Sequence, residues 1–413
     1  MKNIYEYLLE KADAMKIIDT HEHLNPHKNY VGDVPDILCE YFSHYSSTDL
    51  MSAGMSEAEL DTVRDYQKDI VERFKILSPY LDCIRNTSYY RALKIAASKL
   101  HKVPDITIDT IEELNEKFKK AVSDDNYRRY VMKEVCNIEV SVNDAWIGDI
   151  KQATTELFAA AWHPDPYMTP GMKPEAASLD EYCEVYKQHF LKQIKDGMKT
   201  LKSTAAYWRS LYYEDVDYKT ASELYNNYIK NLKDDDENVA PFPKPLQDYM
   251  MHYILKTADE NNFVIQIHTG LQEGMRNNLE NSNPMLLKNL FGKYQNLTFD
   301  LFHLGYPYER ELMVLAKINP NVYIDMCWTH IISPYAARNA FNEMLDVLPY
   351  TKIFGFGGDY IFYDGVVGHL TIAKQDICEV LADKVNREEI DTELAEKILS
   401  AVLHDNAKKI FKL

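Results

Sequence analysis

Short apolar runs that end on a histidine or another polar or aromatic residue recur along this chain, and they constrain its fold more than any other feature. Their length and residue types are those of buried β-strands. Helix-forming stretches at 284–294 and 308–317 separate consecutive runs, so strand and helix alternate, which predicts a parallel sheet of βαβ units. The clearest runs cover residues 16–20, 263–267, 297–302, 321–327 and 352–358, and they lead into His21, His268, His303, Trp328 and Asp359.

Three weaker runs raise the number of predicted strands to eight. They cover residues 137–142, 155–161 and 198–204, and the second of them would serve equally well as the start of a helix. Eight parallel strands are the number that a closed (β/α)8 barrel needs. A chain of 413 residues fits one such barrel with insertions or two ordinary domains. The regular alternation favours a single α/β barrel domain over residues 1–413.

Residues 24–130 are too long for a crossover between the first two strands. They are rich in helix formers, above all at 56–75 and 111–122. We therefore expect a helical insertion that follows the first strand directly and forms a cap over the barrel mouth. A charged, proline-rich stretch at 231–245 is predicted to be a loop.

The strongest local motif is His21-Glu22-His23 at the end of the first run. In an extended backbone, residues two apart project to the same face. Two imidazoles placed in this way can bind one divalent ion. The alternative is a surface turn with two solvated histidines.

The position of the motif favours the metal site. Active sites of α/β barrels lie at the carboxyl ends of the strands, and His268, His303 and Asp359 end other runs. The chain has only 13 histidines, so their repeated occurrence at strand ends is informative. We expect His21, His23, His268 and Asp359 to be the metal ligands.

These motifs together resemble those of the amidohydrolase superfamily of metal-dependent barrel hydrolases. The resemblance rests on the first-strand signature 19–24 (DTHEHL), His268 in 266–270 (QIHTG), His303 in 302–308 (FHLGYPY), Asp359 in 357–360 (GGDY) and the tail 405–411 (DNAKKIF). Residues 202–207 (KSTAAY), 268–270, 306–308 and the helical insertion are similar to the amidohydrolase-type domain found fused to glutamine-synthetase-like domains, and more distantly to uronate isomerase. That branch has Arg directly after the residue matching Tyr207, whereas this chain has Trp208 and then Arg209.

The resemblance implies one divalent metal ion, which we expect to be Zn2+. The expected reaction is hydrolysis of an amide or ester bond of a small, carboxylate-bearing substrate through a metal-activated water. Asp359 would carry the proton, and His303 would stabilise the oxyanion. The alternatives are a uronate-isomerase-like aldose–ketose isomerase, a metal-dependent decarboxylase and a metal-binding protein that is not an enzyme. The last is disfavoured, since a closed structural site has no use for a histidine beyond its four ligands.

Three further residues are candidates for substrate binding. Trp328 ends the seventh run, and Arg85 lies in the insertion, where it could pair with a substrate carboxylate or simply with surface carboxylates of the chain. Lys202 ends the predicted fourth strand. It could bind a substrate anion, be an ordinary surface lysine, or be carbamylated and bridge a second metal, as in binuclear members of the superfamily; the resemblance favours one ion.

Composition narrows the partners and the location. The net charge is −18, so nucleic-acid and anionic-membrane partners are not expected. The N-terminus lacks the apolar stretch of a signal peptide, and no run approaches the length of a membrane span. The six cysteines form no CxxC pair. We expect a cytoplasmic enzyme with free thiols and a small-molecule substrate, with assembly into a homo-oligomer left open.

Overall fold

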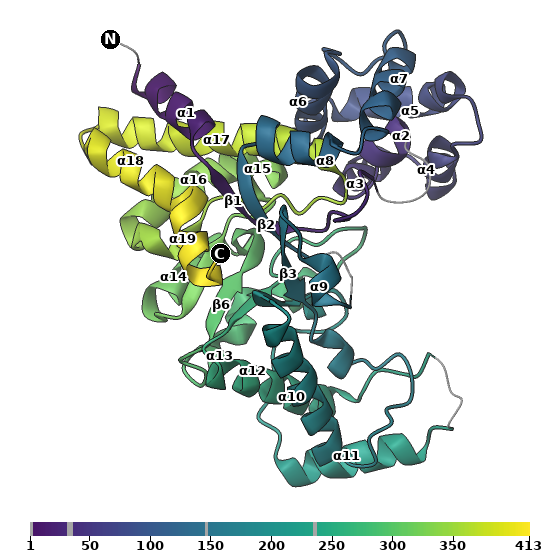
Figure 1. Cartoon of the computed structure of the whole chain (residues 1–413), viewed down its shortest axis with the longest axis vertical. Coiled ribbons are helices and arrows are strands. Elements are labelled where there is room, and N and C mark those ends of the chain that lie inside the picture. Colours follow the sequence, from purple (N-terminus) through teal and green to yellow (C-terminus); the bar gives the residue numbers. More distant parts are fainter. Residues whose placement is uncertain (1–2, 31–35, 145–147, 234–237) are drawn as a thin grey trace.

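Eight parallel strands form one sheet in chain order, as the alternating runs predict (Figure 1). The computed structural model describes residues 3–30, 36–144, 148–233 and 238–413. Each strand lies where a run was found, including the ambiguous third one. The strands are β1 (Ile17–Glu22), β2 (Ile138–Asn143), β3 (Phe158–Trp162), β4 (Thr200–Ser203), β5 (Val264–Ile267), β6 (Thr298–Leu301), β7 (Val322–Asp325) and β8 (Ile353–Phe354).

Hydrogen bonds between β1 and the segment after β8 close the barrel. The Thr20 amide donates to the Phe356 carbonyl at 3.1 Å, and the Asp359 amide donates to the His21 carbonyl at 2.8 Å. The predicted (β/α)8 fold is therefore confirmed. Closure brings the two ends of the barrel sequence together, which places Asp359 beside the histidine motif of β1.

Helices cover the barrel and form the insertion. Those outside the insertion are α1 (Ile4–Ala14), α9 (Ile150–Ala153), α10 (Leu179–Lys195), α11 (Tyr218–Lys230), α12 (Lys244–Glu260), α13 (Lys288–Phe291), α14 (Glu309–Ile318), α15 (Thr329–Ile332), α16 (Pro334–Val347), α17 (Tyr363–Asn386), α18 (Thr392–Ser400) and α19 (Asn406–Phe411). The helix expected over 284–294 is shorter, because a 3-10 turn occupies Pro284–Leu287. The loop expected over 231–245 ends where α12 begins, and its residues 234–237 lie outside the described residues.

The insertion between β1 and β2 is helical, and its helices gather at the upper right of Figure 1. The helix-rich stretch at 56–75 divides into two helices, because Asp69 caps a new helix by accepting from the Val71 and Glu72 amides. The helices are α2 (Ile37–Tyr41), α3 (Tyr45–Ser52), α4 (Glu57–Arg64), α5 (Ile70–Ile84), α6 (Ser88–His101), α7 (Ile111–Val122) and α8 (Tyr127–Arg129).

One buried carboxylate of α17 joins the insertion to the barrel. Asp364 accepts hydrogen bonds from the hydroxyls of Tyr41 and Tyr127 at 2.9 and 2.6 Å and pairs with His101 at 2.6 Å. These three partners come from α2, α8 and α6. The insertion is thereby fixed against the helix that follows Asp359.

Two further observations concern the whole chain. All six cysteines are free of disulfide bonds. Within the described part of the chain, the longest helices are too polar to pass through a lipid bilayer.

Candidate metal centre

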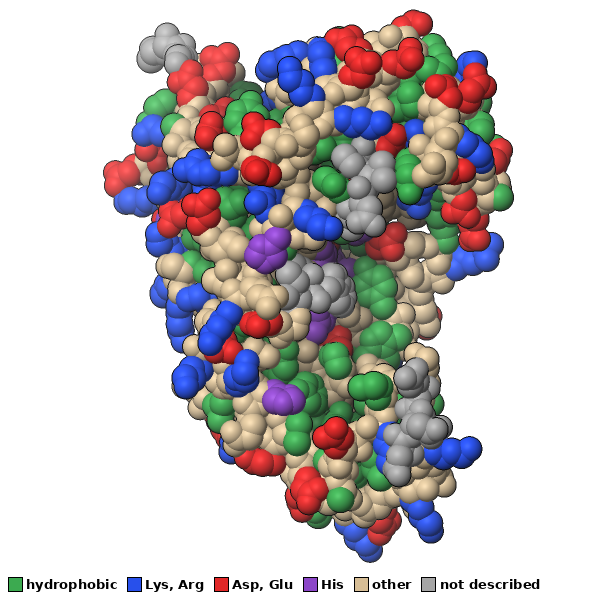
Figure 2. All heavy atoms as spheres, turned by 45° about the vertical axis from the view of Figure 1, so that its right-hand side comes forward, with side chains coloured by type: hydrophobic (Ala, Val, Ile, Leu, Met, Phe, Trp, Pro, Cys, Tyr) green, Lys and Arg blue, Asp and Glu red, His purple; other side chains and the backbone are tan. Residues whose placement is uncertain are grey.

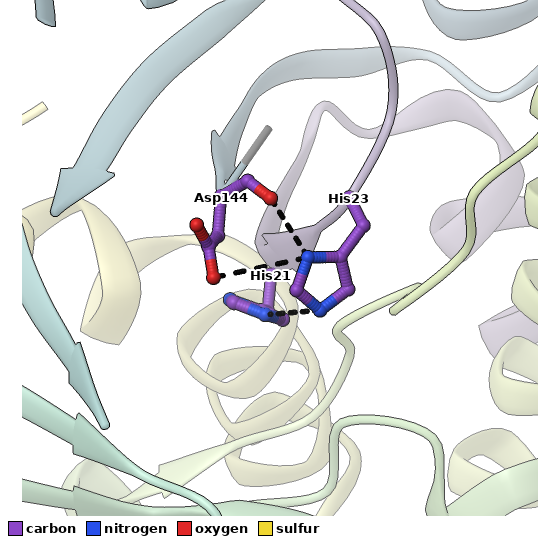
Figure 3. A group of neighbouring side chains, drawn as sticks. All are labelled: His21, His23 and Asp144. Atoms are coloured by element: carbon purple, nitrogen blue, oxygen red, sulfur yellow. Dashed lines mark hydrogen bonds and ion pairs between the residues drawn. The ribbon is translucent and has the colours of Figure 1, made fainter. Parts of the chain in front are cut away.

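Three of the four predicted ligands meet at the carboxyl end of β1. The Nε2 atoms of His21 and His23 lie 3.3 Å apart (Figure 3). The Oδ1 atom of Asp359 lies 3.2 Å from the His23 Nε2 and 3.7 Å from the His21 Nε2. His21 is fully buried and Asp359 nearly so, which excludes the alternative of a solvated surface turn.

One glycine and an unusual backbone turn place Asp359 at this point. The backbone of Asp359 is left-handed, with φ 56°. Gly358 is required before it, since a β-carbon there would lie 1.7 Å from the Glu22 carboxylate. The amides of Gly358 and Tyr360 donate to the carboxylates of Asp19 and Glu22 at 3.0 and 2.7 Å. The buried acids around the motif therefore hold the turn that presents Asp359.

His268 and His303 form a second pair on the other side of Asp359. The His303 Nε2 lies 3.1 Å from the His268 Nδ1 and 3.9 Å from the Asp359 Oδ2. The fourth predicted ligand, His268, thus reaches the Asp359 carboxylate only through His303. The Cys327 thiol also lies in this group, with ligand atoms of His303, Cys327 and Asp359 all within 4.8 Å of one another.

Backbone carbonyls determine the tautomers of three of these histidines. The Nδ1 of His23 is 2.7 Å from the Asp144 carbonyl, the Nδ1 of His303 is 2.9 Å from the Cys327 carbonyl, and the Nε2 of His268 is 3.0 Å from the Leu271 carbonyl. A carbonyl only accepts, so each of these nitrogens carries the proton. In a neutral ring the opposite nitrogen has a free lone pair, and that nitrogen faces the centre.

Burial keeps most of these rings neutral. It lowers the pKa of His21 and His268 well below the usual range and that of His303 to about 4. Burial alone would raise the pKa of Asp359, but its hydrogen bond to His23 and the nearby histidines outweigh this and hold it well below its usual value. His268 and His303 therefore present lone pairs to each other, with no proton between them, beside the anionic Asp359. His23 differs: burial alone would lower its pKa, but its hydrogen bond to Asp359 raises it, and a bound cation would replace that proton. This donor set fits a divalent cation.

Asp144 is a member of the site that the sequence did not single out. It follows β2, and its carboxylate lies 3.8 Å from the His23 Nδ1 (Figure 3). The Asp144 carboxylate also pairs with His163, which follows β3. The Asn143-Asp144 pair after the run at 137–142 was the available signal. Together His21, His23 and Asp144 form a second possible ligand group.

Lys202 is buried, so the alternative of an ordinary surface lysine is wrong. Its ammonium lies 3.7 Å from the centre of the Phe302 ring, and no hydrogen bond joins it to any residue that the structure describes. Burial lowers the pKa of Lys202. Its charge lies near Asp359 and Asp144, at the same end of the barrel.

Trp328 and Arg85 occupy different surroundings. The Trp328 indole is buried among Tyr45, Tyr89 and Tyr360, and it donates to the Tyr89 hydroxyl at 3.1 Å. The insertion therefore contacts the carboxyl end of β7. Arg85 is bound within the insertion, where it pairs with Asp82 and Asp105 and donates to the Tyr90 hydroxyl.

Arg209, whose role the departure at Trp208 left open, is bound to the buried Asp248 and Gln247. Its contacts are structural, and they hold the loop after β4 against α12.

Several histidines lie in the middle of the face drawn in Figure 2, between the insertion above and the barrel below.

Comparison with known proteins agrees with this architecture. The amidohydrolase family model matches residues 232–413, which contain His268, His303 and Asp359. Over these residues the chain is similar to the amidohydrolase family. The resemblance recognised from the motifs is therefore confirmed.

A curated relative of this chain is Protein fluG of Emericella nidulans. It is 26% identical over 257 residues, which cover 59% of this chain and 30% of that protein. The chain thus spans less than a third of the length of this relative.

Solved structures share the fold over almost the whole chain. Uronate isomerase from Thermotoga maritima has a TM-score of 0.78 at 16% identity, covering 100% of this chain and 98% of its own. Glucuronate isomerase from Caulobacter crescentus has a TM-score of 0.77 at 19% identity, covering 99% and 94%. A protein assigned as a metal-dependent hydrolase from Lactobacillus casei has a TM-score of 0.69 at 18% identity, covering 98% and 97%.

Proposed function

We propose that this chain is a metal-dependent hydrolase that cleaves an amide or ester bond of a small, carboxylate-bearing substrate in the cytoplasm. The observation that carries the proposal is the convergence of the His21 and His23 Nε2 atoms and the Asp359 carboxylate at the end of β1. These residues would hold one divalent ion, for which zinc suits the two imidazoles and one carboxylate. An ion bound there would lower the pKa of a water molecule and polarise a substrate carbonyl.

Asp359 is the group best placed to move a proton. Its Oδ1 faces His21 and His23, while its Oδ2 faces His303 at 3.9 Å. The low pKa of Asp359 makes it a carboxylate at neutral pH, so it can accept a proton from water and deliver it to the leaving group.

His303 fits the role of acceptor better than the oxyanion donor that the family resemblance implies. Its Nδ1 proton is used by the Cys327 carbonyl, so the neutral ring presents a lone pair from Nε2. With a pKa of about 4, the ring gains no second proton near neutrality. We assign His303 to accepting a hydrogen bond from water or from a substrate N–H, or to binding metal together with His268.

Lys202 is the candidate partner for the substrate carboxylate. It is a buried cation near the centre, without a hydrogen bond to the described residues. An anionic group that enters this end of the barrel would supply the missing partner. Arg85 and Trp328 have partners within the insertion and the aromatic cluster, so we place them outside direct substrate contact.

Metal analysis tests the centre itself. Purified protein should contain about one equivalent of a transition metal, as expected for one such ligand set. His21→Ala combined with His23→Ala should abolish the bound metal, while His27→Ala combined with His189→Ala, at histidines away from the centre, should not. Full metal retention by the first double variant would overturn the assignment.

The alternative function is isomerisation of a sugar acid, favoured by the fold shared with uronate isomerases over the full chain. The two reactions differ in their use of water. A screen of N-acyl amino acids, lactones and uronates in 18O-labelled water should give a labelled hydrolysis product, and Asp359→Asn should abolish it. Conversion of a uronate to a ketouronate without the label would decide for the isomerase, and release of CO2 for a decarboxylase.

A further inference from the structure

A groove lies between α6 and α17, and none of the candidate metal ligands is among the residues that line it. Its volume is about 740 Å³, within the range of small-molecule sites. Four cationic side chains and one carboxylate line it: Arg85, Arg91, Lys94, Lys99 and Asp105. This excess of positive charge occurs in a chain whose net charge is −18.

The charges in the groove are only partly compensated. Arg85 and Lys94 both pair with Asp105, at 3.2 and 3.6 Å. Lys99 donates to the neutral hydroxyl of Thr371 at 2.9 Å. Among the described residues, neither Arg91 nor Lys99 has a carboxylate partner. Two positive charges therefore remain available to a ligand.

The remaining lining indicates the kind of anion. Asn86, Thr87 and Ser98 supply neutral hydrogen-bonding groups, and Ile95 and Pro104 supply apolar surface. Arg91, Ile95 and Ser98 fall on one face of α6, because residues three and four apart are neighbours on a helix. Guanidinium, ammonium and hydroxyl groups around an apolar strip suit a dianion with several acceptor oxygens and an organic part.

We propose that this groove binds a small organic phosphate, with the phosphate dianion between Arg91 and Lys99 and the organic part against Ile95 and Pro104. The site is separate from the proposed hydrolase centre, and it needs no metal. It requires a doubly charged ligand, since two uncompensated cations line the groove.

The experiment uses phenyl phosphate as the probe and phenyl sulfate as a singly charged ligand of similar shape. At pH 8 the phosphate is a dianion, because its second pKa is about 6. Titration calorimetry of the metal-loaded protein should show phenyl phosphate bound about tenfold more tightly than phenyl sulfate. Equal binding of the two ligands, or none, would overturn the proposal.

Matched charge reversals locate the site. Arg91→Glu combined with Lys99→Glu should weaken phenyl phosphate binding by at least about tenfold. Lys219→Glu combined with Lys230→Glu makes the same charge change at exposed positions on α11 and should leave it within about twofold. Equal loss in both variants would show a general charge effect. Loss in His21→Ala combined with His23→Ala, with the groove variant unaffected, would place the ligand at the metal centre instead.

Discussion

At the barrel mouth, backbone carbonyls fix which ring nitrogen of single histidine side chains carries the proton. Because carbonyls of Asp144 and Cys327 occupy one nitrogen of His23 and His303, the other nitrogen of each ring can only be a lone pair while the ring is neutral. The site is therefore prepared for a cation before any ion binds. Lys202 is the exception, a buried cation beside this set of lone pairs.

Lys202 can be separated from the metal ligands by substitution. If it binds substrate and bridges no second ion, Lys202→Met should leave the metal content at about one equivalent and raise KM more than it lowers kcat. Metal analysis and steady-state kinetics check this, with Lys199→Met, a half-buried neighbour whose ammonium donates to the Lys412 carbonyl, as the control. A fall from two equivalents to one, or activity that depends on added bicarbonate, would instead indicate a carbamylated bridge.

Glu40 should make stability depend on pH. Burial, together with Asp364 and Asp36, raises its pKa to about 8. The Glu40 carboxyl therefore stays protonated in the folded protein at pH values where the unfolded chain has lost this proton. The free energy of unfolding falls as pH rises from about 4.5 to about 8. Glu40→Gln removes that loss, which amounts to at most about 5 kcal/mol. The variant's Tm should exceed the wild type by more at pH 8.5 than at pH 5; an equal difference at both would contradict the assignment.

At the scale of elements, the contact between α6 and α17 depends on one glycine. A β-carbon on Gly368 would lie 1.9 Å from the Ala92 carbonyl oxygen. Gly368→Ala should push the helices apart and lower stability by about 3 kcal/mol, despite the better helix propensity of alanine. Gly292→Ala, with no described atom within 4 Å of its β-carbon, is the neutral control. Urea denaturation that gave equal stabilities for the two variants would show that α6 is free to move.

At the scale of the whole molecule, a metal that binds only the folded state should stabilise it. Chelation of the proposed ion should lower Tm, and restoring zinc should recover it, because ligand binding adds about 2.7 kcal/mol at a hundredfold excess over Kd. Differential scanning fluorimetry with and without chelator checks this. The His21→Ala, His23→Ala variant should show the same Tm in both conditions. A chelator effect that persisted in that variant would place the stabilising ion elsewhere.

The sequence by itself determined the strand order, the eight-strand count and the candidate ligands. Short buried strands have a distinct apolar pattern, and parallel strands bring their carboxyl ends together. It also showed that 24–130 is helical, although the capping carboxylate of Asp69 divided one expected helix into two.

Only the tertiary structure decided how those residues meet. Barrel closure joins His21 to Asp359, a contact between positions 338 residues apart that no local pattern contains. Burial made Lys202 an interior cation, and Arg85 found its partners in Asp82 and Asp105 of the insertion. Tautomers, charge states and the groove beside α6 depend on neighbours that come together only when the chain is folded.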